Sequence, residues 1–162
     1  MNRLLIFAII LFSLSATAQR NPFKNLFEKE GKIGIGTTNP DELLTVKGKI
    51  HTQEVLVDLD GAVAPDYVFE TYYNGFSEMM PEYKLISLEE LEIFLKENHH
   101  LPNVPSAEAM MTEGISLKEM NLILLQKIEE LTLYTLQQQK EIDKLKSKFT
   151  QTENTEKWNL KF

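Results

Sequence analysis

Few residues of this sequence have both the type and the spacing that chemistry at a site requires. The adjacent His99 and His100 could ligate a metal, but neighbouring side chains point to different sides and no second ligand pair lies at helical spacing. A solvent-facing or hydrogen-bonded loop is the better interpretation of this pair. Asp58 and Asp60 precede Gly61 as in a calcium loop, without its further acidic positions or its terminal Glu. The sequence therefore predicts no metal site and no other cofactor.

Composition removes several further classes of function. The absence of cysteine excludes a cysteine nucleophile, a thiolate zinc site and a disulfide scaffold. Gly34 and Gly36 lack the third glycine of a dinucleotide-binding loop. No pair of carboxylates has a setting that would raise the pKa of one, so we expect no hydrolase site. With 17 basic against 24 acidic residues the net charge is −7, and no Lys/Arg cluster offsets it, which argues against nucleic acid as a partner.

The first eighteen residues have the features of an export signal. Arg3 precedes an apolar run over residues 4–14, and the small Ala16 and Ala18 predict cleavage before Gln19. The run is about 11 residues long, whereas a helix needs about 20 to cross a bilayer, so an uncleaved anchor is the weaker alternative. We expect a protein exported through the Sec route, with no stable membrane span after the signal is removed. Its final place would be periplasmic, on the outer surface or extracellular.

The next segment changes from a polar linker to a β-rich element. Residues 19–30 show no strong period, and residues 31–60 contain three short stretches with strand character, 32–36, 43–46 and 50–59. Turn signals separate these stretches. Strands this short cannot bury a core by themselves. They must pack on the rest of the chain or on copies of it.

Residues 61–116 are expected to hold a loop with a brief aromatic run at 66–69, followed by two small helices joined by a Pro-fixed connector over 99–105. The first small helix should begin at Ser87, which forms a capping box with Glu90, and end near Asn98. The second should begin after Ser106 and stop at Gly114. The first has an apolar stripe that we expect to dock on the base of the last helix, chiefly through Leu91, Phe94 and Leu95.

The last helix contains the strongest pattern in the chain. From Leu117 to about Phe149 there is no Gly or Pro, and about 33 residues make a helix of about 50 Å. Seven of ten a and d heptad positions are apolar, which predicts a coiled coil and hence a homo-oligomer. The a positions are Asn121, Ile128, Thr135, Ile142 and Phe149, and the d positions are Leu117, Leu124, Leu131, Gln138 and Leu145.

The two halves of this helix differ. Between residues 120 and 136 apolar side chains also occur off the seam, so this half should be covered by the preceding elements, whereas the polar second half should project. A polar tail is expected over residues 150–162. Ile at a with Leu at d favours a dimer, but the polar layers at Asn121, Thr135 and Gln138 leave dimer against trimer open.

Several strings in the chain resemble known fibre proteins. GKIGIGTTNPDELLTVKGKI (residues 31–50) resembles the β element of phage-type tail fibres and bacterial fibre-like surface proteins. HLPNVPSA (100–107) and KIEELTLY (127–134) are similar to the carboxy-terminal module of exported bacterial tail-fibre-like proteins. The resemblance covers residues 31–145. It implies an α+β fold with a β-rich shaft element over 31–60, a helical module over 61–149 with its coiled coil at about 117–149, and a homotrimer.

The resemblance implies a non-enzymatic structural module that trimerises for assembly or surface display. The alternative is an autocleaving peptidase, because the module is distantly similar to the endosialidase-type intramolecular chaperone domain. That chemistry needs a nucleophilic Ser or Thr, commonly in a Ser-Asp pair, and a base. The chain has Ala64-Pro65-Asp66 at the corresponding place, and Ser87, Ser106 and Ser116 have helix-cap contexts. We therefore do not expect an enzyme.

The terminal heptads alone would also fit a basic-leucine-zipper DNA binder. The residues before the coil are acidic, with Glu108, Glu113 and Glu119 against Lys118. Phosphate would repel such a segment. Together with the export signal, this excludes the DNA-binding interpretation.

Overall fold

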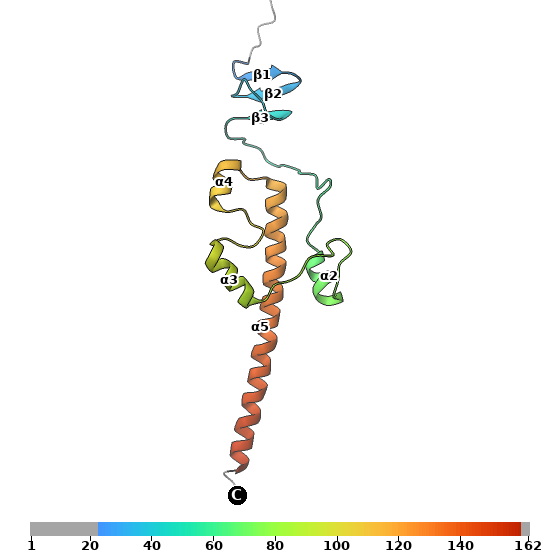
Figure 1. The fold of residues 1–162 in the computed structure, drawn as a ribbon, viewed down its shortest axis with the longest axis vertical. Coiled ribbons are helices and arrows are strands. Elements are labelled where there is room, and N and C mark those ends of the chain that lie inside the picture. Colours follow the sequence, from blue (N-terminus) through green and yellow to red (C-terminus); the bar gives the residue numbers. More distant parts are fainter. Residues whose placement is uncertain (1–22, 160–162) are drawn as a thin grey trace, which may run out of the picture. The chain divides into compact units, whose positions relative to one another are not determined.

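The computed structural model describes residues 23–159, with side chains as far as residue 152. The chain is α+β and divides after Val55 into two compact units. The first holds a small three-stranded sheet, and the second holds helices, the last of which is long (Figure 1).

The sheet of the first unit has the order β1-β2-β3. β1 (Leu26–Lys29) and β2 (Lys32–Ile35) are antiparallel, and their two-residue turn places Glu30 and Gly31 at φ 54° and 79°. Left-handed conformations at both turn positions match the twist of a tight hairpin. β3 (Leu44–Val46) runs parallel to β2.

Small and polar residues fix the connection from β2 to β3. The Thr45 hydroxyl donates to a carboxylate oxygen of Asp41 at 2.6 Å and accepts from the amides of Asp41 and Glu42, each at 3.1 Å. This hydroxyl lowers the pKa of Asp41. A Cβ at Gly34 would lie 2.3 Å from the carbonyl oxygen of Thr37, so only glycine fits there.

The sheet has no apolar core of its own. Among residues 23–55 only Gly34 and Thr45 are buried, while Ile33, Ile35 and Leu44 are exposed. A three-stranded sheet normally needs a covered apolar face to be stable. As the sequence predicted, these strands do not bury an apolar core by themselves.

Two sequence expectations about the strands were wrong. β1 lies inside the stretch predicted as a linker, because the turn at Glu30 and Gly31 folds residues 26–29 back along β2. Residues 50–59 form no strand and are exposed throughout. A strand needs a neighbouring strand edge for its hydrogen bonds, and these residues have none within the described chain.

The second unit begins with helix α2 (Tyr67–Asn74), where the sequence predicted only an aromatic run and a loop. α3 (Leu88–Asn98), α4 (Ala107–Glu113) and α5 (Leu117–Asn159) follow. The capping box of Ser87 with Glu90 is confirmed, and the Ser106 hydroxyl accepts from the Ala109 amide at 3.2 Å.

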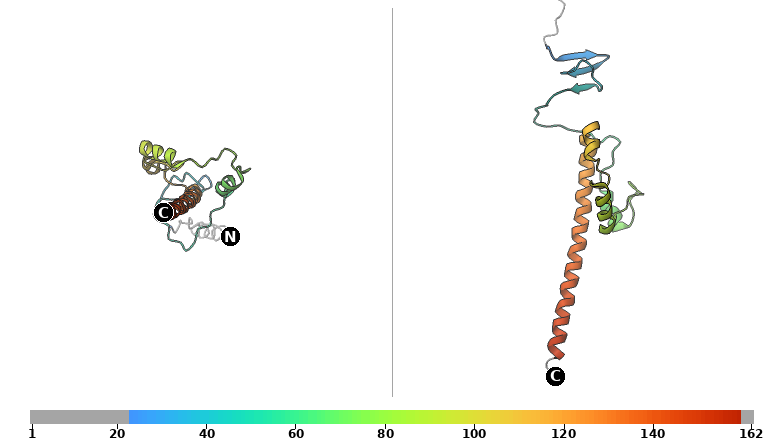
Figure 2. Two further views of the ribbon diagram at one scale, coloured as in Figure 1. Left: turned by 90° about the horizontal axis from the view of Figure 1, so that it is seen from below. Right: turned by 60° about the vertical axis from the view of Figure 1, so that its left-hand side comes forward.

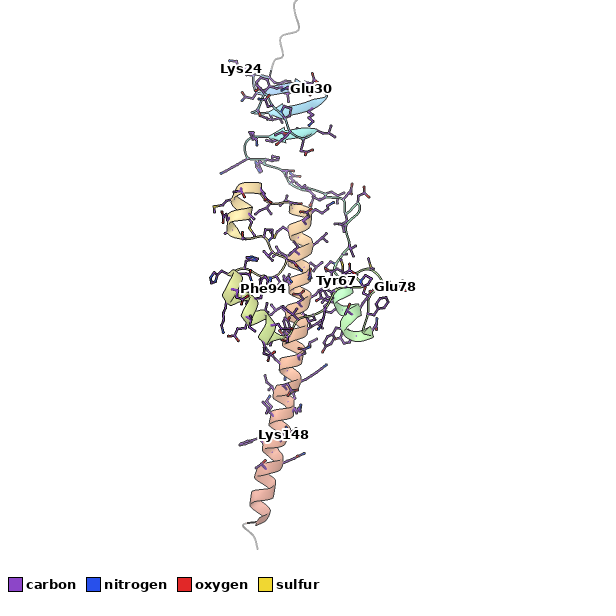
Figure 3. All side chains as sticks on the ribbon, in the orientation of Figure 1. Lys24, Glu30, Tyr67, Glu78, Phe94 and Lys148 are labelled. Carbon is purple, nitrogen blue, oxygen red and sulfur yellow. The ribbon has the colours of Figure 1, made fainter. Side chains whose placement is uncertain are left out.

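α2 packs on α5 and provides the core of this unit. Tyr67 and Val68 form a buried cluster with Leu133 of α5, and Figure 3 shows Tyr67 between the two helices. α3 lies on another side of α5 (Figure 2) and has no buried residue. The expected covering of the first half of α5 is thus met only in part: Leu133 and Tyr134 are buried, Leu125 is exposed, and the helix that packs on Leu133 is α2, which the sequence did not predict.

α5 continues through Asn159, ten residues beyond the predicted end of the coil. Its buried side chains are Gln126, Glu129, Leu133 and Tyr134. The second half of α5 extends beyond the other helices of this unit (Figure 1). Every side chain from 135 to 152 is exposed, as expected for a projecting half.

Candidate self-association surface

The predicted seam of α5 is exposed along its whole described length. Its apolar members have exposed fractions between 45% and 66%, and its polar members are exposed as well. The seam as predicted consists of Leu117, Asn121, Leu124, Ile128, Leu131, Thr135, Gln138, Ile142, Leu145 and Phe149. At 3.6 residues per turn these positions share one side of the helix. The single chain therefore presents an exposed stripe of about 50 Å on which seven of the ten side chains are apolar.

The opposite side of α5 is the one that the chain covers itself. Gln126, Glu129 and Leu133 lie roughly half a turn away from the seam and are buried. Leu131, two residues from Leu133, is 64% exposed, whereas Leu133 is fully buried. α5 thus has an internal face that is filled and an external face that is not.

A polar network holds the loop after α2 against the filled face. The Tyr67 hydroxyl donates to Gln126 at 3.0 Å, and the Gln126 amide donates to Glu130 at 2.7 Å. Tyr83 and Lys127 also donate to Glu130, at 3.2 and 2.8 Å. The Glu130 carboxylate is therefore held by three donors, and it fixes the 80–83 loop and α2 relative to α5.

The tyrosines of this region act as hydrogen-bond donors. Burial, followed by the charge of Glu130, raises the pKa of Tyr67, Tyr83 and Tyr134. Their hydroxyls stay protonated at neutral pH, and that of Tyr134 donates to the carbonyl oxygen of Ile86 at 2.8 Å. A hollow of about 420 Å³ lies beside the network. Its lining includes Glu130, whose oxygens are occupied by these bonds, so the arrangement fits a structural role.

Glu129 is the exception to this pattern of satisfied groups. Its side chain is buried, and its Oε2 has no hydrogen-bond partner in the described part of the chain. Burial, and secondarily the charge of Asp66, raises the pKa of this carboxyl. An unpaired buried carboxylate is destabilising, so we expect Glu129 to lower the free energy of unfolding of the protein.

An apolar groove of about 350 Å³ opens between α3, the connector and α5. Three seam residues form its floor, and Leu91, Leu101 and Pro102 form the opposing wall. Lys127 and Glu130, also in the lining, are paired with each other at 2.8 Å. The lining residues are Leu91, Leu101, Pro102, Leu124, Lys127, Ile128, Glu130, Leu131 and Tyr134. The groove is thus a continuation of the exposed seam, and of the three docking residues expected on α3 only Leu91 lines it.

The residues considered for chemistry have ordinary structural positions. His99 ends α3 in a left-handed conformation with φ 59°, and His100 packs edge-on against Phe94 with ring centroids 5.7 Å apart. Within the described residues, no three His, Asp or Glu side chains come together as a metal site. Pro65 is buried and Asp66 is the N-cap residue of α2, so no Ser-Asp pair stands at the place considered for autocleavage.

The three serines considered as nucleophiles lie before helices. Their hydroxyls accept from amides three residues on, at 3.1, 3.2 and 3.4 Å for Ser87, Ser106 and Ser116. The predicted cleavage residues Ala16, Ala18 and Gln19 lie outside the described part of the chain. Among residues 23–159, no helix combines the length and apolar character that crossing a bilayer demands.

Sequence reasoning missed both the groove wall and the network. The sequence indicated only a rigid connector at Leu101 and Pro102, which line the groove. Because Gln126 and Glu129 are polar, their residue types did not indicate that they belong to a second, buried face of α5. The available signal was the spacing of residues 126, 129 and 133, which repeats at helical intervals opposite the seam.

We compared the chain with protein-family models, curated proteins and solved structures, and none of the three comparisons finds a match.

Proposed function

We propose that this chain is an exported, non-enzymatic structural module that assembles with copies of itself through the seam of α5. By its resemblance to tail-fibre-like proteins, the assembly is a parallel homotrimer that serves fibre assembly or surface display. The observation that carries the proposal is the exposed apolar stripe on α5, opposite a face that the chain has already filled.

The size of the effect agrees with self-association. Covering the exposed part of one large apolar side chain contributes about 1 kcal/mol, and the seam has seven of them in each chain. Association costs roughly 4–15 kcal/mol in lost translational and rotational freedom. The gain exceeds this cost only when most layers are filled, so a single charged layer should prevent assembly.

The first unit supports the same conclusion independently. Its strands leave Ile33, Ile35 and Leu44 exposed, and a sheet without a covered face is marginal in water. Copies that associate along α5 would supply neighbouring chains for this sheet too.

Leu131→Glu tests the proposal. The side chain is 64% exposed in the single chain, so the substitution leaves the fold of one copy intact. In a parallel assembly it places carboxylates together at one layer, and we expect the mass measured by light scattering to fall to that of a monomer.

Leu136→Glu is the matched control, because Leu136 is exposed on the same helix but lies outside the seam. This variant should keep the mass of the original assembly. A monomeric mass for the unchanged protein at micromolar concentration, or an unchanged mass for Leu131→Glu, would overturn the proposal.

A further inference from the structure

We infer that α3 and the connector after it form an arm that clasps the α5 helix of the neighbouring copy, and that the groove behind the arm receives the neighbour's Leu125. The inference rests on the proposed function, since it needs a second copy on the seam.

The first argument is the state of α3 itself. This helix is 11 residues long and carries several apolar side chains, yet none of its residues is buried. Leu88 and Ile93 are exposed, and Leu91 faces the groove rather than a filled core. The capping box and the bond from Tyr134 to Ile86 hold α3 in place without closing it onto α5. The helix is therefore positioned next to α5 with space left between them.

The second argument is the identity of the groove floor. Leu124, Ile128 and Leu131 belong both to the groove and to the seam. Whatever covers the seam at this level must enter the groove. The charged part of its lining, Lys127 and Glu130, is already paired, so the incoming surface needs no charge of its own.

The third argument is the heptad geometry. Lys127 and Tyr134, on the groove side, occupy g positions, and Leu125 occupies an e position on the other flank of the seam. In a parallel coiled coil the g flank of one helix faces the e flank of its neighbour. Leu125 is 43% exposed, apolar and at the level of the groove floor, so it is the side chain that a neighbour would present there.

The contact joins two different patches, the groove and the Leu125 flank. A heterologous contact of this kind closes into a ring when copies are related by rotation about the coil axis. The arm would therefore add a second set of contacts around the coil, and it would give α3 the burial that it lacks in one chain.

Cysteine cross-linking tests the inference, because the chain has no cysteine of its own. Two differently tagged chains, one with Leu101→Cys and the other with Leu125→Cys, are co-expressed and oxidised. We expect a disulfide-linked pair that contains both tags. Both positions are about 40% exposed, so the substitutions should leave the fold of each chain intact.

Two controls decide the outcome. Leu136→Cys replaces Leu125→Cys as an equally exposed position on the same flank of α5 but about 16 Å further along the helix, and it should not cross-link to Leu101→Cys. Leu145→Cys alone reports on the seam in the projecting half. If Leu145→Cys links and the Leu101–Leu125 combination does not, or if Leu136→Cys links equally well, the clasp is refuted while self-association stands. If Leu145→Cys fails to link as well, the proposed function fails with it.

Discussion

At the scale of single residues, Glu129 and Leu131 have environments opposite to those that their side chains favour. Leu131 is exposed where a large apolar residue is unfavourable, and Glu129 is buried where a carboxylate is unfavourable. The first makes sense in an assembly that covers the seam. The second faces the intramolecular contact with α2, and its Oε2 has no partner there in the described chain.

Replacing Glu129 with Met should stabilise the protein at neutral pH. The substitution removes a buried oxygen without a hydrogen-bond partner, which costs about 1–3 kcal/mol. Urea unfolding at one fixed protein concentration measures the gain. Glu141→Met is the control, because Glu141 is exposed and only paired with Lys144 on the surface, and it should change the unfolding free energy by less than about 0.5 kcal/mol.

The same residue gives a pH dependence with a defined sign. Burial raises the pKa of Glu129 above its unfolded value of about 4.3. At pH values between the unfolded and the folded pKa, the folded state therefore binds more protons than the unfolded state. The original protein should lose stability as the pH rises from about 4.3 through the raised pKa. The advantage of the Met variant should therefore grow over this range and then level off. An advantage that shrinks as the pH rises would contradict the assignment.

At the scale of elements, the sequence was most informative where a helix is long or has a clear cap. The bounds of α3 and the start of α5 follow from Ser87, Ser116 and an uninterrupted heptad pattern. These signals are local, so they can be read without knowing what the helix touches. The seam followed from the same periodicity.

The elements that were missed depend on contacts distant in sequence. α2 has a hydrogen bond from Tyr67 to Gln126, 59 residues away, and its Asp66 provides no side-chain cap. Its eight residues are too few to be stable alone. β1 similarly exists only through its pairing with β2. α2 forms because it packs on α5, and β1 forms because it pairs with β2. The local sequence of α2 or β1 does not specify these partners.

Leu133→Ala and Leu131→Ala should separate the two faces of α5. Leu133 is fully buried against α2, so its truncation should cost about 2–5 kcal/mol and lower the stability at every protein concentration. In the proposed assembly Leu131 is buried by a partner copy, so its truncation should mainly raise the concentration at which the assembly dissociates. Thermal unfolding over a dilution series measures both effects. Equal, concentration-independent losses would place Leu131 inside the single chain.

At the scale of the whole molecule, charge and apolar surface act against each other. Each chain has a net charge of −7, which makes copies repel one another, while in the proposed assembly burial of the exposed seam draws them together. The ion pairs of the projecting half, Lys144 with Glu141 and Lys146 with Asp143, are exposed and lie within one helix. Such pairs add little to stability. For the proposed assembly to form, the free energy gained by burying the seam must therefore exceed the repulsion between the chains.

Salt should consequently strengthen assembly. Raising the ionic strength from about 0.01 M to about 0.15 M shortens the Debye length from about 30 Å to about 8 Å and screens the repulsion between chains. We expect the dissociation midpoint, measured by light scattering over a dilution series, to shift severalfold toward lower protein concentration. Leu136→Glu adds one more negative charge per chain outside the seam, so it should steepen this dependence. Dissociation on adding salt would mean that ion pairs between chains, rather than the apolar seam, hold the copies together.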